Sequence, residues 1–347
     1  TVHQTFVLVC LALLSTAQAR AADPPVAGPV DADALSLADE AKPAARPSRN
    51  WRVFGEGSLS RTSGRGGTPD ADGARLSLDL RYDASIAPGL RAVVSDRLDL
   101  SRSSEAARET NVNTLREAYL SWHATPDLIG DLGRINIRNG SASGYNPTDF
   151  FKAGALRSIV SPDPEALREN RQGTFVIQAQ KLWSGSSLTA TFSPRLGRTP
   201  SNSTFTLDVG ATNPRNRWLL AGSHKFGENF NPQLLLFGGA GTPTQAGLNL
   251  SGVVNSATVA FLEFSTGKGR SLMAQALGTA EPERTQRRAA LGLTYTTAFN
   301  LSLTAEADYN SAAPDRQQWN AFSGGAPGNA LRLLAASAKL QDLPVRQ

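Results

Sequence analysis

The sequence has very few of the residues on which several common protein classes depend. Of its 347 residues, one is cysteine, one is methionine and three are histidine. A single cysteine cannot build an intrachain disulfide framework, which excludes a small disulfide-stabilised fold. No stretch after the first residues reaches the about 20 consecutive apolar residues of a membrane-spanning helix, which excludes a helical membrane protein. The formal net charge of +5 is small for this length and does not indicate nucleic-acid binding.

The beginning of the chain is typical of an export signal. Phe6 to Leu14 form a short apolar core, and Ala17 and Ala19 follow in the A-x-A pattern of a cleavage site. We therefore expect residues 1–19 to be a signal peptide, and the apolar run is too short for the alternative, a membrane anchor. The basic residues that open such signals are missing before Phe6, so we expect the natural protein to begin further upstream.

Cleavage there would leave a mature chain without cysteine, because Cys10 lies inside the signal. Such a chain suits an oxidising periplasm. Residues 20–50 are rich in alanine, aspartate and proline and show no periodicity. We expect them to form a flexible periplasmic lead-in.

From Trp51 onward, short segments alternate between apolar and polar residues. The clearest examples are 74–83, 288–296 and 300–310. Side chains on a strand point to opposite faces in turn, so each segment has one apolar and one polar face. A soluble β-sandwich produces the same local pattern, with its apolar faces in a dry core.

Three further features favour a membrane barrel over a sandwich. Charges of both signs occupy the middle of the polar faces, which a water-filled lumen tolerates. Long and short connections alternate along the first part of the chain. Aromatic residues lie near strand ends, where interfacial girdles belong: Trp51, Tyr82, Trp122, Trp183, Trp218, Tyr295 and Tyr309. We predict an all-β, antiparallel transmembrane β-barrel over residues 51–347, located in the bacterial outer membrane.

The alternating segments predict about sixteen strands. They are 51–61, 74–83, 90–101, 114–122, 130–138, 174–183, 187–194, 203–210, 217–226, 233–239, 247–254, 258–266, 271–278, 288–296, 300–310 and 330–340. The last residues, Leu343 to Gln347, read as a turn and not as a closing strand with a terminal aromatic. Because an unpaired strand edge is costly in lipid, we expect the natural protein to continue further and to contain about 16–18 strands.

The most distinctive stretch contains LREAYLSW at 115–122 and DLGRINIRNGSASGYNPTDFF at 131–151. It resembles a family of Gram-negative outer-membrane barrels related to the alginate exporter and other large porin-like proteins. The resemblance lies within 115–175, and the rest of the chain agrees only in strand rhythm. It implies an outer-membrane pore or exporter whose long loop, 139–173, folds into the lumen, and it does not identify the cargo. The matching residues are Gly133, Arg134, Arg138, Gly140, Asn146, Pro147, Asp149 and Arg171.

The charges on predicted inward faces are the candidate pore-lining residues. Arg134, Asn136 and Arg138 share one face of a strand, and alternate guanidinium groups suit carboxylate or phosphate cargo. The alternative is that these arginines pair with Asp149, Glu165 or Glu169 and hold the loop inside the barrel. Both interpretations stay open. The other candidate pore-lining residues are Arg75, Arg81, Glu306 and Asp308.

The long loop provides the candidates for a constriction. Asn146, Pro147 and Asp149 are turn-forming residues and more typical of loop shape than of chemistry. Phe150 could anchor the loop against the wall or stack on a sugar ring, and Arg171 is the remaining candidate for the constriction. We also expect a short helix from Pro162 to Arg171, capped by Ser161.

These observations predict a channel that passes small polar or anionic solutes, or oligosaccharides. Its expected partners are outer-membrane lipid and the solute, without cofactor, metal or nucleic acid, and the oligomeric state stays open. One alternative is a plugged, adhesin-like surface barrel without transport. The other is a lipid-modifying enzyme, which would require a histidine beside a nucleophile. The sequence offers only His123 with Ser121 and His224 with Ser223, so we predict no catalytic residues.

Overall fold

The structure is a computed structural model that describes residues 50–63, 70–103, 110–157, 164–227, 229–314 and 316. The expected signal peptide, the lead-in before Asn50, the expected helix cap at Ser161 and the predicted strand 330–340 lie outside the described residues.

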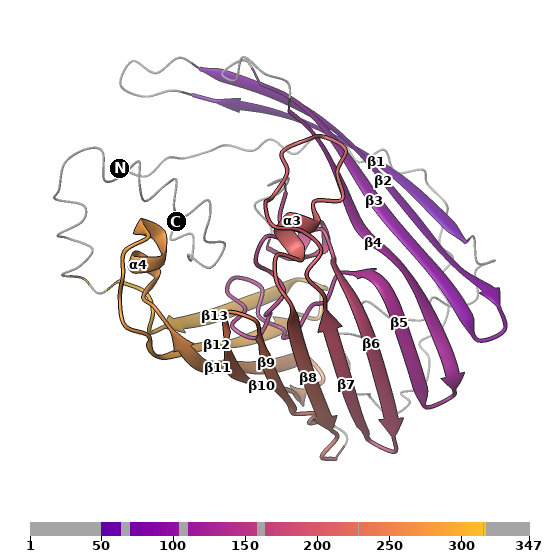
Figure 1. Cartoon of the computed structure of the whole chain (residues 1–347), viewed down its shortest axis with the longest axis vertical. Coiled ribbons are helices and arrows are strands. Elements are labelled where there is room, and N and C mark those ends of the chain that lie inside the picture. Colours follow the sequence, from indigo (N-terminus) through magenta and orange to yellow (C-terminus); the bar gives the residue numbers. More distant parts are fainter. Residues whose placement is uncertain are drawn as a thin grey trace.

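Thirteen antiparallel strands in the described residues form one sheet, and each pairs with the next strand along the chain (Figure 1). This all-β, antiparallel arrangement agrees with the predicted fold class. β1 and β13 are the two edge strands of the described sheet. The strands are β1 (Trp51–Thr62), β2 (Ala71–Ala87), β3 (Leu90–Ser103), β4 (Thr110–Thr125), β5 (Leu128–Ile135), β6 (Thr174–Trp183), β7 (Ser186–Ser193), β8 (Arg217–His224), β9 (Gln233–Gly239), β10 (Thr242–Asn255), β11 (Thr258–Gly269), β12 (Arg284–Thr296) and β13 (Ser302–Asn310).

Three short helices lie in the connections: α2 (Pro164–Glu169), α3 (Val209–Thr212) and α4 (Leu272–Leu277). None of the helices in the described ranges has the length and apolar character needed to cross a bilayer.

Short turns and long connections fall at opposite ends of the strands. The turns 88–89, 126–127, 184–185 and 256–257 are short, whereas 136–173, 194–216 and 270–283 are long. This is the alternation expected from the sequence. The exception is β9–β10, which are joined by Ala240 and Gly241 alone. In the sequence, too, the connections in this part of the chain are short on both sides.

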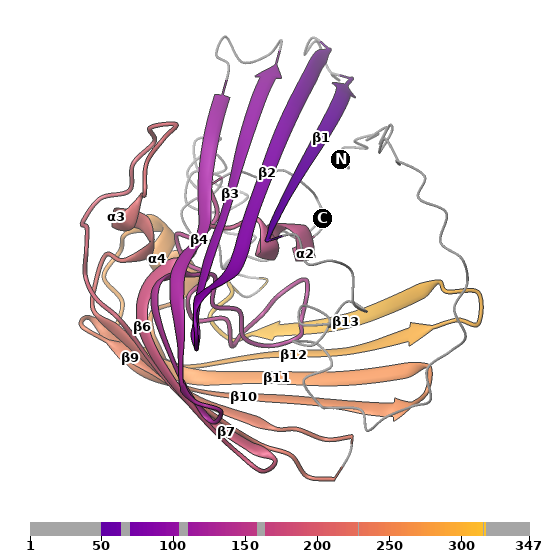
Figure 2. The ribbon, with the colours of Figure 1, turned by 90° about the vertical axis from the view of Figure 1, so that its right-hand side faces the viewer.

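The sheet curls into a trough with a convex and a concave face (Figure 2). The side chains alternate between these faces as predicted. On β2, Leu78 and Leu80 are each 45% exposed on the convex face. The residues that alternate with them, Ser77 and Asp79, are buried on the concave face. The convex face is therefore apolar, and most buried polar groups lie on the concave face.

Two of the predicted strands are not strands. Segment 203–210 runs into α3, and its Asp208 adopts a left-handed φ of 41° while its carboxylate accepts a hydrogen bond from the Ser201 backbone amide at 2.7 Å. Aspartate and asparagine tolerate this conformation better than other side chains, and it breaks a strand.

Segment 271–278 contains α4. Ser271 caps the helix by accepting a hydrogen bond from Ala274 N at 3.1 Å, and Gly278 ends it at a φ of 68°. A serine cap and a terminal glycine are ordinary helix boundaries, which alternation alone concealed. With the predicted strand 330–340 outside the described residues, these two segments account for the difference between about sixteen predicted strands and the thirteen described.

Candidate functional site: a loop fastened to the concave face

The connection between β5 and β6, residues 136–173, lies on the concave side of the trough, and we call it the inner loop (Figure 2). Its described parts are 136–157 and 164–173. It contains all the residues proposed from the sequence for a constriction. Contacts from β4, β8, β9, β11 and β13 position it.

The first attachment is a buried carboxylate on β11. Glu263 is 1% exposed and accepts hydrogen bonds from the backbone amides of Ser141 and Ala142, the latter at 2.5 Å, and from Thr148 Oγ1 at 3.0 Å. Gly140 allows this approach, because a Cβ atom there would lie only 2.3 Å from the carboxylate of Glu263. Its φ of 80° also favours glycine.

A second carboxylate holds the next three residues of the loop. Glu306 of β13 accepts hydrogen bonds from the backbone amides of Ser143 at 2.9 Å, Gly144 at 3.0 Å and Tyr145 at 3.0 Å. Glu306, proposed from the sequence as a pore-lining charge, is thus engaged by the inner loop. Asp308, the next inward position on β13, carries the other acidic group beside it.

The third attachment is apolar. The ring of Phe150 stacks on that of Phe237 with centroids 4.9 Å apart, and Phe151 meets the same ring edge-on at 5.6 Å. Leu219 of β8 and Leu235 of β9 complete a buried cluster with them. Of the two roles considered for Phe150, this geometry corresponds to anchoring the loop on the wall.

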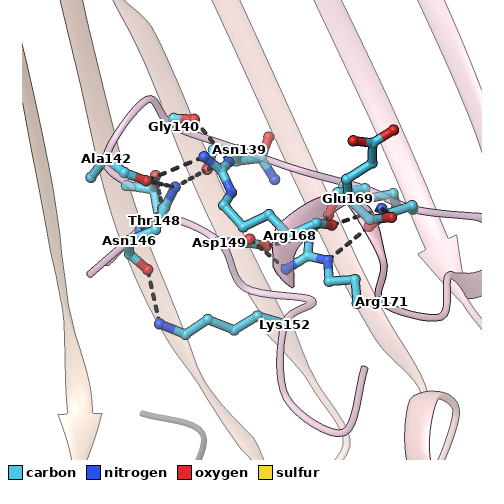
Figure 3. A network of polar contacts seen from close by, with 12 residues as sticks. Asn139, Gly140, Ala142, Asn146, Thr148, Asp149, Lys152, Arg168, Glu169 and Arg171 are labelled. Carbon is cyan, nitrogen blue, oxygen red and sulfur yellow. Dashed lines mark hydrogen bonds and ion pairs between the residues drawn. The ribbon is translucent and has the colours of Figure 1, made fainter. Parts of the chain in front are cut away.

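Within the loop, Arg171 joins its two ends (Figure 3). Its guanidinium group contacts both carboxylate oxygens of Asp149, at 2.6 and 3.1 Å, and donates from Nε to Asn136 Oδ1 at 2.7 Å. This ion pair is buried on both sides. The sequence suggested Arg134 or Arg138 as the partner of Asp149, and Arg171 occupies that position.

The turn of the loop is closed by bonds to backbone carbonyl groups (Figure 3). Arg168 donates to Gly140 O at 3.0 Å and to Ala142 O at 3.2 Å, and burial lowers the pKa of its guanidinium group. Asn146 donates to Asn139 O at 2.7 Å, and Lys152 donates to Asn146 O at 3.0 Å. Pro147 is buried beside Asn146. These residues shape the loop.

Arg134, Asn136 and Arg138 do not share a strand face as predicted, because β5 ends at Ile135 and only Arg134 lies on it. Arg134 is buried, and its guanidinium group donates to Gln172 Oε1 at 3.3 Å and to the carbonyl oxygen of Leu207. It therefore packs between the inner loop and the β7–β8 connection. Arg138 is exposed. Asn136, between them, donates to Arg168 O at 3.0 Å.

The opposite wall, β1–β4, carries an ion-pair lattice of its own. Glu56 accepts from Arg75 and Arg97, both at 3.1 Å. Arg81 contacts Glu117 at 3.4 Å. Two further pairs continue the lattice: Arg91 with Asp83 and Arg116 with Asp79. Arg75 and Arg81, proposed as pore-lining residues, both belong to this lattice.

Sequence reasoning missed several residues that position the loop, chiefly Glu263, Phe237 and Arg168. The sequence pattern could have identified Glu263, because it is a charged residue between the apolar neighbours Leu262 and Phe264 in an alternating strand. No sequence pattern indicates which face of the sheet Phe237 occupies, since LLLF at 234–237 shows no alternation.

The histidines considered for an enzyme lie at the short-turn end. His224 Nδ1 is 2.6 Å from Ser186 Oγ in an exposed pair, whereas Ser223 bonds Ser187 at 2.7 Å. His123 is exposed close to the turn between β4 and β5. In the described part of the chain, no group of three histidine, cysteine or acidic side chains is placed to hold a metal ion.

No family model and no curated protein matches the chain. Among solved structures, it is similar to Salmonella typhi OmpF in complex with daunomycin, with 11% identity over 75% of this chain and 78% of that one, at a TM-score of 0.45. Acinetobacter baumannii OccAB1 is 12% identical over 74% and 64% at a TM-score of 0.48, and Pseudomonas aeruginosa OpdQ is 11% identical over 76% and 67% at 0.40. The resemblance to the alginate-export family stays a prediction.

Proposed function

We propose that the chain forms a porin-like channel in the Gram-negative outer membrane. The observation that carries this proposal is the separation of the two faces across the whole sheet. Large apolar side chains are exposed on the convex face from β1 to β13, and buried ionic groups lie on the concave face. Exposed apolar side chains in such a continuous array suit lipid, and the polar concave face suits a water-filled lumen.

In this proposal, small polar or anionic solutes, or oligosaccharides, pass between the inner loop and the β1–β4 wall. Three charged side chains of β1–β4 support that path, because they form ion pairs and yet remain 38–43% exposed to solvent. They are Glu56, Arg81 and Arg91. The inner loop narrows the lumen from the other side, where Glu263, Glu306 and Phe237 fasten it.

Current through a planar bilayer tests the proposal. The full-length protein should give stepwise ionic currents, and a folded, inserted protein without current would contradict a channel.

Arg138→Ala should move the reversal potential in a KCl gradient towards cation preference, because Arg138 is exposed. Arg134→Ala should instead lower stability, because its guanidinium group is buried among loop carbonyls.

One observation favours a second candidate, a plugged surface barrel. The inner loop packs Phe150 and Phe151 onto an apolar stretch of the concave face, where a fully open channel would present polar groups. A plugged barrel would give almost no current with the wild-type loop. Substitutions that detach the loop would then open a current that the wild type lacks.

A further inference from the structure

Three neighbouring side chains on the concave face carry polar atoms without hydrogen-bond partners. In the register of the sheet, Ser265 of β11 lies opposite Arg288 of β12, and Arg288 lies opposite Asn310 of β13. Ser265 Oγ, Arg288 Nε and Asn310 Nδ2 are each buried and without a partner within the described ranges. One cross-strand row therefore holds three unsatisfied groups that can donate a hydrogen bond.

The bonds that Asn310 and Arg288 make leave one donor group of each residue without an acceptor. Asn310 Oδ1 accepts from Ala312 N at 2.9 Å, so the amide nitrogen is the end without a partner. Arg288 donates from Nη1 to Gln245 Oε1 at 3.2 Å, which leaves its Nε edge unused. Ser265 is 1% exposed, whereas Arg288 and Asn310 are partly exposed, so a solute can approach the row from the side of these two residues.

The row contains a positive charge without a carboxylate to match it. Arg75 and Arg97 on the opposite wall both contact Glu56, whereas no described acidic group lies within 4.0 Å of the Arg288 guanidinium group. Glu263, two residues along β11 from Ser265, is engaged by the inner loop. Buried polar groups are normally satisfied, so a set of donors around one unpaired cation indicates a missing anionic acceptor.

We propose that Ser265, Arg288 and Asn310 form an oxyanion-binding site on the lumen wall, which holds the carboxylate or phosphate group of a passing solute. This inference rests on the proposed channel function and adds a solute class and a place to it. Facing side chains on neighbouring strands lie about 5 Å apart, so Ser265 and Asn310 flank Arg288 on its two sides, within reach of an oxyanion bound to its guanidinium group. β11, β12 and β13 lie side by side along one wall of the trough (Figure 2).

The test uses the full-length protein in planar bilayers with inorganic phosphate as the probe and acetate in a parallel series, at constant ionic strength. The readout is each protein's own ratio of current with the oxyanion to current in chloride alone. In the wild type, the ratio should fall and saturate as the oxyanion is added. Arg288→Gln should raise the half-maximal concentration by about tenfold or more, because a charge-assisted bond is lost. A stronger effect of acetate would assign the site to carboxylates, and a stronger effect of phosphate to phosphate groups.

Two more variants sharpen the test. Arg287→Gln is the matched control, because Arg287 is the exposed neighbour on the convex face of β12 and should respond as the wild type does. Asn310→Asp places a carboxylate beside Arg288 and should abolish the oxyanion effect by occupying the guanidinium group. It keeps the test valid if Arg288→Gln does not fold. If Asn310→Asp and a folded Arg288→Gln both respond as the wild type does, the site is overturned.

Calorimetric titration of the detergent-solubilised protein with phosphate and acetate separates failure of the site from failure of the channel. A protein that conducts, but whose current and calorimetric signal respond to neither ion, would overturn the site and leave the channel standing. A protein without current that still binds an oxyanion, with an affinity that Asn310→Asp abolishes, would contradict the channel and support the site. Absence of both current and binding would overturn both.

Discussion

The two walls of the concave face balance their charges in different ways. On β1–β4, acidic and basic side chains of neighbouring strands neutralise each other, as Glu56 does with Arg75 and Arg97. On β8–β13, the carboxylates Glu263 and Glu306 bind backbone amides of the inner loop, and Phe237 packs against the loop's aromatic rings.

This difference explains where the inner loop lies. A wall whose charges mostly pair with each other needs little from another segment of the chain and can face water, although Arg116 also donates to Asn170 of the loop at 3.0 Å. A wall that carries Glu263 and the ring of Phe237 is more stable when another segment covers it, and both side chains are buried beneath the loop. The position of the loop should therefore depend on β8–β13, whereas β1–β4 should contribute to charge selectivity without holding the loop.

The largest expected effect is that of Phe237→Ala. Its ring contacts both Phe150 and Phe151, so its loss should lower the free energy of unfolding by about 3–5 kcal/mol and loosen the loop. Urea titration of the lipid-folded protein measures this effect. Leu236→Ala is the control, because Leu236 is exposed on the convex face, and an equal loss in both variants would refute the special role of Phe237.

Glu263→Gln should come next. The substitution removes the charge that three loop donors share, which should cost about 2–3 kcal/mol and raise single-channel conductance as the loop leaves the wall. The matched control is Glu117→Gln, a carboxylate of the opposite wall that pairs with Arg81. Equal conductance changes in the two variants would remove the distinction between the walls.

Gly140→Ala should have a smaller effect of about 1–2 kcal/mol. A methyl group there meets the Glu263 carboxylate, and the φ of 80° is unfavourable for alanine. Thermal unfolding detects the change, and combination with Glu263→Ala, which removes the side-chain atoms that a methyl group at position 140 would meet, checks its cause. If the steric conflict with Glu263 is the cause, the two effects should be less than additive.

Glu56→Gln should change stability least, by less than about 1 kcal/mol, because the side chain is 39% exposed. It leaves Arg75 and Arg97 without their shared counter-charge, so the wall gains positive charge. The reversal potential in a KCl gradient should move towards anion preference. An unchanged reversal potential would mean that this wall does not border the path of the ions.

Much of the fold could be predicted because alternation is a local property. The strands at 74–83 and 288–296 and the long connection after Arg134 were all found from the sequence. Segments 203–210 and 271–278 show the limit, since each alternates well enough for a strand. A left-handed Asp208 and the caps at Ser271 and Gly278 determine their actual conformations.

The candidate site could be predicted only in part. The sequence located the loop and its turn at Asn146 and Pro147, and it identified Phe150 and Arg171 as structural candidates. It could not identify the partners of these residues. Arg134 shows this most clearly, because it follows the inward pattern and yet is buried against Leu207 of another connection.

The sequence by itself determined that the chain makes strands with one apolar and one polar face, since neighbouring residues along a strand point in opposite directions. The tertiary structure alone decided which partner each polar side chain contacts. Glu263 and Ala142 are 121 positions apart, and Glu306 and Ser143 are 163 apart. The curvature of the sheet brings such pairs together, and no local pattern records that curvature.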